Sequence, residues 1–88
     1  MSIKKFVYEK IDLKLPLLII KAKSGLLGCG YLNVETFNKT GESCAIVSGV
    51  STHESMFEAL VKSVSKAAQE KGVEKGMTGL EALELMNL

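Results

Sequence analysis

Strand patterns fill the first third of this chain and helical patterns follow, and this order of elements constrains the fold most. Residues 3–15 carry strand signals, and apolar and charged side chains alternate over 11–15, as in a half-buried strand. The unbroken apolar run at residues 17–20 is typical of a strand covered on both faces. A tight turn at Ser24-Gly25 predicts that residues 26–32 return as the next strand of a hairpin.

A helix, a strand and a longer helix are predicted next. Asn33 is a typical N-cap and Gly41 a typical helix stop, so a short helix lies between them. Residues 43–50 have the apolar character of a buried strand. Apolar residues then recur at the helical period over residues 51–71, which predicts the longest helix of the chain.

Two predicted helices begin with the spacing of a capping box, in which two polar side chains satisfy free backbone N–H groups. Ser51 and Glu54 have this spacing before the long helix, and Thr78 and Glu81 have it before a short terminal helix. The predicted order is β-β-β-α-β-α-α. The predicted fold class is α+β: a two-layer sandwich, with a mixed sheet of about four to five strands and helices on one face.

The apolar content exceeds what one copy of a small domain readily buries. No repeat or linker divides the 88 residues, so we expect residues 1–88 to form a single domain. A chain of this length buries only about two-thirds of its unfolded surface, yet 47% of its residues are hydrophobic. We therefore predict a homo-oligomer in which the strands of residues 3–32 form the interface.

Charge and apolar runs argue against two classes of partner. Eleven basic and ten acidic residues are interspersed without a basic stripe, so nucleic-acid binding is not predicted. The apolar run of residues 15–20 is too short to cross a membrane, and the N-terminus lacks the pattern of a signal peptide. Two cysteines in apolar runs are typical of a reducing compartment, so we expect a cytoplasmic protein.

Several blocks of sequence together resemble a known family. They are Gly-Cys-Gly-Tyr-Leu-Asn at 28–33, Ala-Ile-Val-Ser-Gly-Val at 45–50, and Gly-Met-Thr-Gly at 76–79 with Glu-Ala-Leu at 81–83. The chain is similar over residues 15–86 to the small bacterial and archaeal proteins grouped as domain of unknown function 1805. This resemblance implies an α/β domain whose N-terminal β region makes a homo-oligomer, a tetramer. It supplies no activity and no catalytic residues.

Cys29 is the candidate for covalent chemistry. It lies between Gly28 and Gly30, whose missing side chains would leave a trough where a ligand can approach the backbone and the thiol. A nucleophilic cysteine needs a nearby base, and the single histidine, His53, follows a different predicted strand. The alternative is that Cys29 is a small buried residue of the core.

Ser51 and Thr52 are candidates for binding a small anionic ligand. They lie where a strand runs into a helix N-terminus, whose free N–H groups and dipole attract anions. Ordinary helix capping explains Ser51 without any ligand. No Walker-type phosphate loop is present, and one histidine with two separated cysteines gives no metal-binding pattern, so neither a cofactor nor a metal is predicted.

Two functions from different classes remain open. The first is a homo-oligomeric domain with a binding or structural role. The alternative is a small-molecule enzyme or ligand sensor, with a site between the Gly28 and Gly30 trough and the helix start at Ser51. Residue patterns alone leave open whether the protein is an enzyme.

Overall fold

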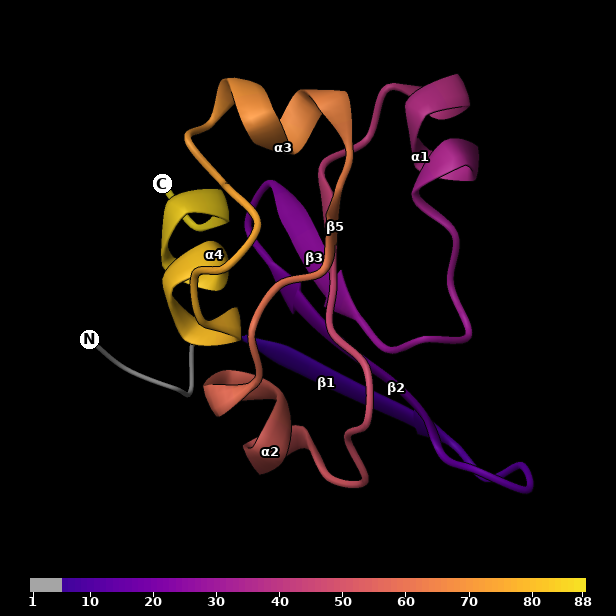
Figure 1. Ribbon diagram of the computed structural model, residues 1–88. Helices are drawn as coiled ribbons and strands as arrows, with labels where there is room; N and C mark the ends of the chain where they lie inside the picture. Colours follow the sequence, from indigo (N-terminus) through magenta and orange to yellow (C-terminus); the bar gives the residue numbers. More distant parts are fainter. Residues whose placement is uncertain (1–5) are drawn as a thin grey trace.

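The computed structural model describes residues 6–88, which form a five-stranded mixed sheet and four helices (Figure 1). The strands are β1 (Val7–Ile11), β2 (Leu17–Ala22), β3 (Gly25–Gly28), β4 (Cys44–Ile46) and β5 (Ser63–Val64). The helices are α1 (Val34–Thr40), α2 (His53–Glu58), α3 (Lys66–Glu70) and α4 (Gly79–Met86). The predicted α+β class is confirmed, and the order agrees once the long helix predicted over residues 51–71 is divided into α2, β5 and α3.

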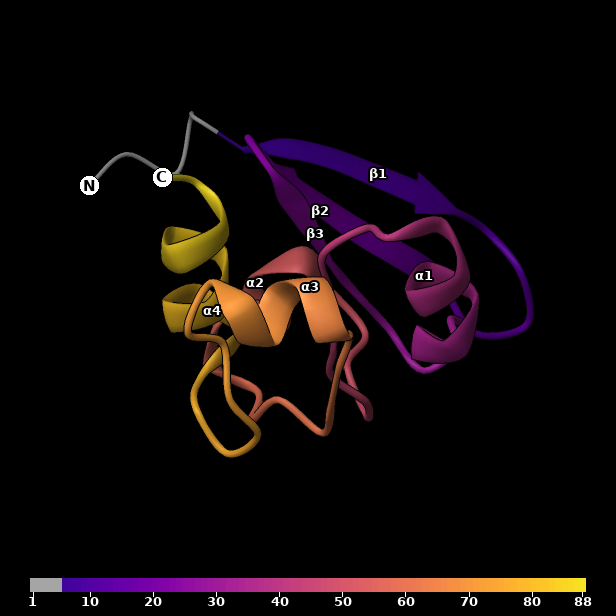
Figure 2. The same cartoon turned by 90° about the horizontal axis from the view of Figure 1, so that it is seen from above.

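The strands lie in the sheet in sequence order, β1-β2-β3-β4-β5. The pair β3–β4 is parallel, and the other neighbouring pairs are antiparallel. A parallel pair needs a crossover connection, which here contains α1. Figures 1 and 2 show α1 on one side of the sheet and α2 and α4 on the other. The predicted layer of helices on one face therefore describes α2 and α4, whereas the crossover carries α1 to the opposite face at β4.

The N-terminal strands are shorter than predicted. β1 ends at Ile11, and residues 12–16 connect it to β2, while residues 3–5 lie outside the described residues. The tight turn falls at residues 23–24, because Ala22 pairs with Gly25. β3 stops at Gly28 rather than continuing to residue 32, since the chain turns back there, with Leu32 N–H donating to the Cys29 carbonyl (3.1 Å).

The long helix predicted over residues 51–71 is wrong. It is divided into α2, β5 and α3, because the backbone between the two helices bonds to other segments. Val61 N–H donates to the Met77 carbonyl, and Lys62 N–H to the Ile46 carbonyl, both at 2.8 Å. Val61 and Val64 are buried as expected, but from an extended segment that lies against β4. Apolar spacing alone did not distinguish the two conformations.

Local helix signals at the other ends are confirmed. The Asn33 side chain accepts a hydrogen bond from Glu35 N–H at the start of α1, and Gly41 ends that helix with φ 78°. Thr78 and Glu81 form the predicted capping box of α4. These signals depend on neighbours within four residues, which explains why the sequence was sufficient to predict them.

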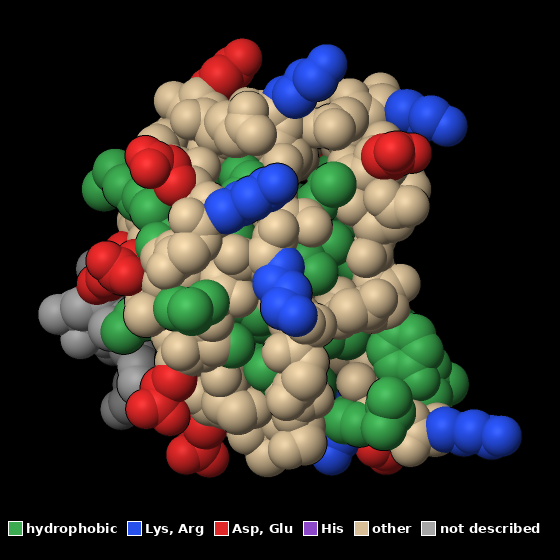
Figure 3. Space-filling view, viewed as in Figure 1, with side chains coloured by type: hydrophobic (Ala, Val, Ile, Leu, Met, Phe, Trp, Pro, Cys, Tyr) green, Lys and Arg blue, Asp and Glu red, His purple; other side chains and the backbone are tan. Residues whose placement is uncertain are grey.

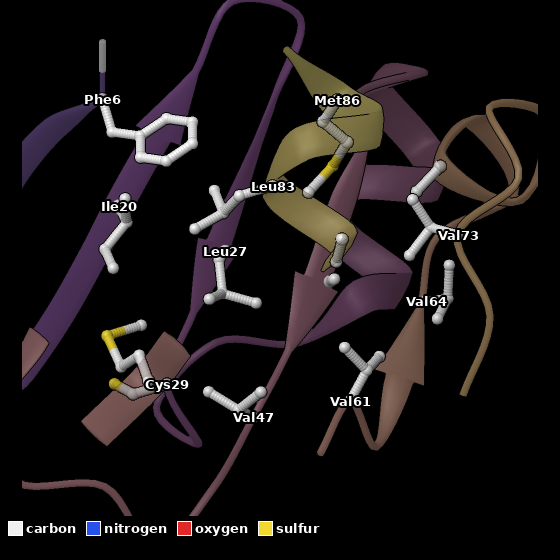
Figure 4. Packing of buried hydrophobic residues seen from close by; sticks show 14 of the residues in the cluster. Phe6, Ile20, Leu27, Cys29, Val47, Val61, Val64, Val73, Leu83 and Met86 are labelled. Carbon is white, nitrogen blue, oxygen red and sulfur yellow. The ribbon is translucent and has the colours of Figure 1, made fainter. Parts of the chain in front are cut away.

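The main core lies between the sheet and the helices α2 and α4. Ile20 and Leu27 of the sheet lie on the same side as Leu83 and Met86 of α4, as the labelled side chains of Figure 4 show. These four side chains and that of Leu18 are fully buried in one cluster. The β2–β3 turn also caps α4, because the backbone N–H (2.8 Å) and hydroxyl (2.6 Å) of Ser24 both donate to the Met86 carbonyl.

Candidate functional site

A pocket of about 520 Å³ lies where three connecting segments meet. Residues 15–16 come from the β1–β2 loop, residues 29–31 follow β3, and residues 49–51 lie between β4 and α2. The pocket brings together three of the predicted site residues, Cys29, Gly30 and Ser51. Gly28 and Thr52 are not among its lining residues.

The Cys29 thiol lies at the wall of this pocket and is almost wholly buried, with 4% of the residue exposed. Its Sγ accepts a hydrogen bond from Leu18 N–H (3.3 Å) and lies 4.0 Å from the Pro16 carbonyl oxygen. Cys29 is thus tied to the start of β2 and also belongs to the core cluster. A ligand in the pocket would meet the edge of this residue rather than a projecting thiol.

The side chain of His53 contacts strand β1. Its Nε2 lies 2.8 Å from the Glu9 carbonyl oxygen, and its ring packs edge to face on Tyr8 with centroids 5.3 Å apart. Both contacts belong to β1, so the imidazole is not a hydrogen-bond partner of Cys29. The structure does not bring the predicted nucleophile and the histidine together.

The two glycines beside Cys29 differ. A Cβ added to Gly28 would overlap the Leu32 side chain, whose Cγ would be 3.2 Å away, so the chain itself fills the expected trough there. Gly30 is exposed, and the nearest atom to an added Cβ is the Cβ of Ser48 at 3.7 Å. Only the Gly30 side of the trough faces the pocket.

The start of α2 is capped one residue later than predicted. Thr52, not Ser51, is the N-cap, and its Oγ1 accepts a hydrogen bond from Ser55 N–H (3.0 Å). The Ser55 hydroxyl in turn accepts from the N–H groups of Thr52 (3.2 Å) and Ser51 (3.3 Å). The three N–H groups of Ser51, Thr52 and Ser55 therefore have partners within the chain, and Glu54 takes no part in the capping box.

The second cysteine, Cys44, is buried in β4 and lies outside the pocket. Burial and the nearby negative charge of Glu42 raise the pKa of its thiol to about 12. The thiol is therefore protonated at neutral pH and is a poor nucleophile there. Among residues 6–88, no three His, Cys, Asp or Glu side chains lie close enough together to hold a metal ion. The same residues contain no helix long and apolar enough to cross a membrane.

A second surface carries exposed apolar side chains on β1 and the loop after it. Val7, Ile11, Leu13 and Leu15 are each exposed by 51% to 69%, and we call these residues the arm surface. In the register of β1 with β2, Val7 and Ile11 lie on the opposite face of the sheet from the buried pair Leu18 and Ile20. Figure 3 shows green side chains gathered at the lower right, where Figure 1 places the β1–β2 loop.

Three comparisons with known proteins agree with one another. Residues 28–86 match a family model described as "Domain of unknown function (DUF1805)". The chain is 31% identical over 83 residues to the uncharacterized protein YunC of Bacillus subtilis strain 168, covering 86% of this chain and 82% of YunC. It is also similar to the crystal structure of TA1206, a protein of unknown function from Thermoplasma acidophilum. The TM-score is 0.80 and the identity 31%, and 92% of each chain is covered.

None of these comparisons indicates a specific function. They confirm the family predicted from the sequence blocks, and this chain belongs to domain of unknown function 1805.

Proposed function

We propose that the protein works as a homo-oligomeric domain with a binding or structural role, and that its copies associate through the arm surface. The observation that carries this proposal is the exposure of the arm surface, 51% or more for each of its side chains. Burial of one such side chain contributes about 1.5–3 kcal/mol, so covering several favours association. Apolar side chains that gather in one region, unlike single ones, typically mark interaction sites.

The position of β1 in the sheet supports the same proposal. β1 is an edge strand, and all of its residues are exposed. An uncovered edge with apolar neighbours is a template for pairing with another chain. Leu17 and Ile19, which pair with Ile11 and Glu9, extend the apolar face from β1 onto β2. A second copy covering this face would shield β1 and β2 together.

The family resemblance implies a tetramer, and a tetramer of dihedral symmetry uses two kinds of two-fold contact. The sheet face around Val7 and Ile11 would supply one contact, and the protruding loop with Leu13 and Leu15 the other. We also place the protein in the cytoplasm. Both cysteines are free and buried, which suits a reducing compartment.

Light scattering coupled to gel filtration at micromolar concentration tests the association. We expect the native protein to have the mass of an oligomer and the double variant Leu13→Lys with Leu15→Lys to have a lower mass. Leu60→Lys is the control, because Leu60 is 59% exposed but lies outside the arm surface. A native protein with the mass of one chain would contradict the proposal.

A second candidate function is a ligand sensor or small-molecule enzyme at the pocket. It is supported by the arrangement of Cys29, Gly30 and Ser51 around a single pocket. A titration of the native thiols with a colorimetric disulfide reagent tests the nucleophilic role of Cys29, with Cys29→Ala and Cys44→Ala assigning each phase. We expect Cys29 to react faster than Cys44. Equal, slow reaction of both thiols would remove the nucleophilic role.

A further inference from the structure

We infer that the pocket takes a neutral, largely apolar small molecule with a hydroxyl or amide group, rather than an anion. This inference rests on the second candidate function, in which the pocket is a ligand site. It replaces the small anionic ligand expected from the sequence around Ser51 and Thr52. Three features of the lining carry it: its lack of charge, its apolar walls and its unpaired peptide groups.

The lining contains no charged or titratable nitrogen or carboxylate side chain. Residues 15–16, 29–31 and 49–51 include no Lys, Arg, His, Asp or Glu. An ion entering such a site loses hydration and gains no opposite charge, which is costly. The Ser51 N–H group, which lies in the pocket lining just before α2, already bonds to the Ser55 hydroxyl (3.3 Å). A neutral ligand avoids this cost.

The walls provide apolar contact area. Leu15 and Pro16 form one side, and Tyr31 and Val50 line the pocket from the other two segments. Leu15 is 69% exposed and Tyr31 47% exposed, so both have area left to bury against a ligand. Pockets of a few hundred Å³ with mainly apolar walls are typical of small-molecule sites.

The polar groups of the pocket are neutral dipoles. Within residues 6–88, the backbones of Gly30, Gly49 and Val50 make no hydrogen bond. Gly49 is exposed, has φ 72° and has no atom within 4 Å of an added Cβ, so the space beside its Cα is open to a ligand. The Tyr31 hydroxyl accepts from Leu15 N–H (3.3 Å) and keeps its own proton to donate. Such donors and acceptors fit a hydroxyl or an amide.

Chemical-shift titrations of the full chain with matched probes test the inference. Phenol and benzamide are neutral and aromatic, benzoate has the same ring with a charge, and inorganic phosphate is an anion without a ring. We expect phenol or benzamide to shift the amide resonances of residues 29–31 and 49–51 saturably. We expect benzoate to bind at least tenfold more weakly and phosphate to leave these resonances unchanged.

A variant that fills the pocket provides the second arm of the test. Gly30→Val adds a side chain at the pocket wall, and its Cβ would be in ordinary contact with its nearest neighbour, the Cβ of Ser48 at 3.7 Å. We expect it to weaken phenol binding at least tenfold while the fold is retained. Lys75→Val, an exposed position outside the pocket, is the matched control and should bind phenol normally.

The outcomes separate this inference from the proposals on which it depends. Binding of benzoate or phosphate in preference to phenol would overturn the ligand class and leave the pocket as a ligand site. Absence of binding by every probe would overturn the class and the second candidate function together. Phenol binding only to an Ile11→Lys, Leu13→Lys variant, which leaves the pocket lining unchanged, would show that a second copy occupies the pocket. That result would overturn the inference and support the homo-oligomer.

Discussion

Two regions of this small domain differ in how far they bury their large apolar side chains. In the packed region, which comprises β2–β5 and the helices, Leu18 and Leu83 are fully buried. In the arm, which comprises β1 and residues 12–16, Leu15 is 69% exposed and Ile11 54%. α2 reaches β1 through the ring of Tyr8, whose centroid is 6.3 Å from that of Phe57. The helices thus shield the packed region, while the arm keeps apolar surface that they do not cover.

The sharpest test of this contrast is one substitution made in both regions. Leu18→Ala removes a fully buried side chain from β2, and we expect it to lower the free energy of unfolding by about 3–4 kcal/mol. Leu15→Ala, three residues earlier, should change the free energy of unfolding of dilute protein by less than about 0.5 kcal/mol.

Urea unfolding followed by circular dichroism measures both variants. The two regions also predict opposite results for assembly, because Leu15→Ala should weaken self-association and Leu18→Ala should not do so directly. If Leu15→Ala destabilised the dilute protein as much as Leu18→Ala, the arm would be part of the packed region and the contrast would fail.

The next largest effect on stability is expected at Gly79, where two backbone segments of the packed region lie close together. A Cβ on Gly79, the first residue of α4, would overlap the Met56 carbonyl oxygen and lie 2.8 Å from Leu27 Cδ2. Because a carbonyl cannot move aside as a side chain end can, we expect Gly79→Ala to destabilise the fold by about 2–3 kcal/mol. Thermal unfolding should show the loss.

Gly30→Ala is the matched control at the pocket. Its Cβ would have its nearest neighbour at 3.7 Å, an ordinary contact, so we expect a change within about 0.5 kcal/mol. A large loss of stability at Gly30, or none at Gly79, would show that the packing around these glycines differs from the structure.

The fold was predictable where neighbours in sequence decide it. Asn33, Gly41 and the Thr78–Glu81 pair each act within four residues, and the structure confirms all of them. The division of residues 51–71 was not predictable in the same way, because it depends on pairing of β5 with β4, about 18 positions away in the chain (Val64 against Ala45, Ser63 against Ile46). The crossover of α1 to the opposite face likewise follows from the parallel pairing of β3 and β4, which the strand patterns do not specify.

The site was predictable only in part. The sequence pointed to Cys29, Gly30 and Ser51, and these residues line one pocket. It did not reveal that Leu32 turns back over Gly28, or that Leu15 and Pro16 reach the pocket from a distant loop. The cap of α2 shifted by one residue, because Ser51–Glu54 and Thr52–Ser55 have the same spacing and both fit a capping pattern.

The Cys44 thiol should make the free energy of unfolding of the packed region depend on pH. Its pKa in the folded protein is raised to about 12 from the ordinary 9.0 by burial and by Glu42. Above pH 9 the unfolded chain loses this proton while the folded chain keeps it, so stability is full below pH 9 and falls as the pH rises toward 12. This group alone should cost about 1 kcal/mol at pH 10 relative to pH 7.

Denaturant unfolding at pH 7 and pH 10 measures this contribution. Cys44→Ala should lose about 1 kcal/mol less between the two pH values than the native protein, whereas Cys29→Ala, which keeps Cys44, should retain the contribution of Cys44. Identical pH dependence of the native protein and Cys44→Ala would mean that Cys44 is accessible to water in the folded state.

The smallest expected effect is on the stability of α4, the last helix of the packed region. The hydrogen bonds that Glu81 accepts from the Thr78 backbone (2.9 Å) and side chain (3.0 Å) lower the pKa of the Glu81 carboxyl. The capping box therefore favours the fold above the ordinary pKa of this carboxyl and loses its effect as the pH falls through the lowered value.

Thr78→Ala removes the cap and should cost about 1 kcal/mol at pH 7, whereas Thr78→Ser keeps the hydroxyl and should cost less. Because Ala82, Leu83 and Met86 anchor α4 in the core, this loss should appear in cooperative unfolding of the whole packed region, measured by amide hydrogen exchange. Exchange confined to the first turn of α4, with no change in its buried positions, would show instead that the helix start frays independently of the core.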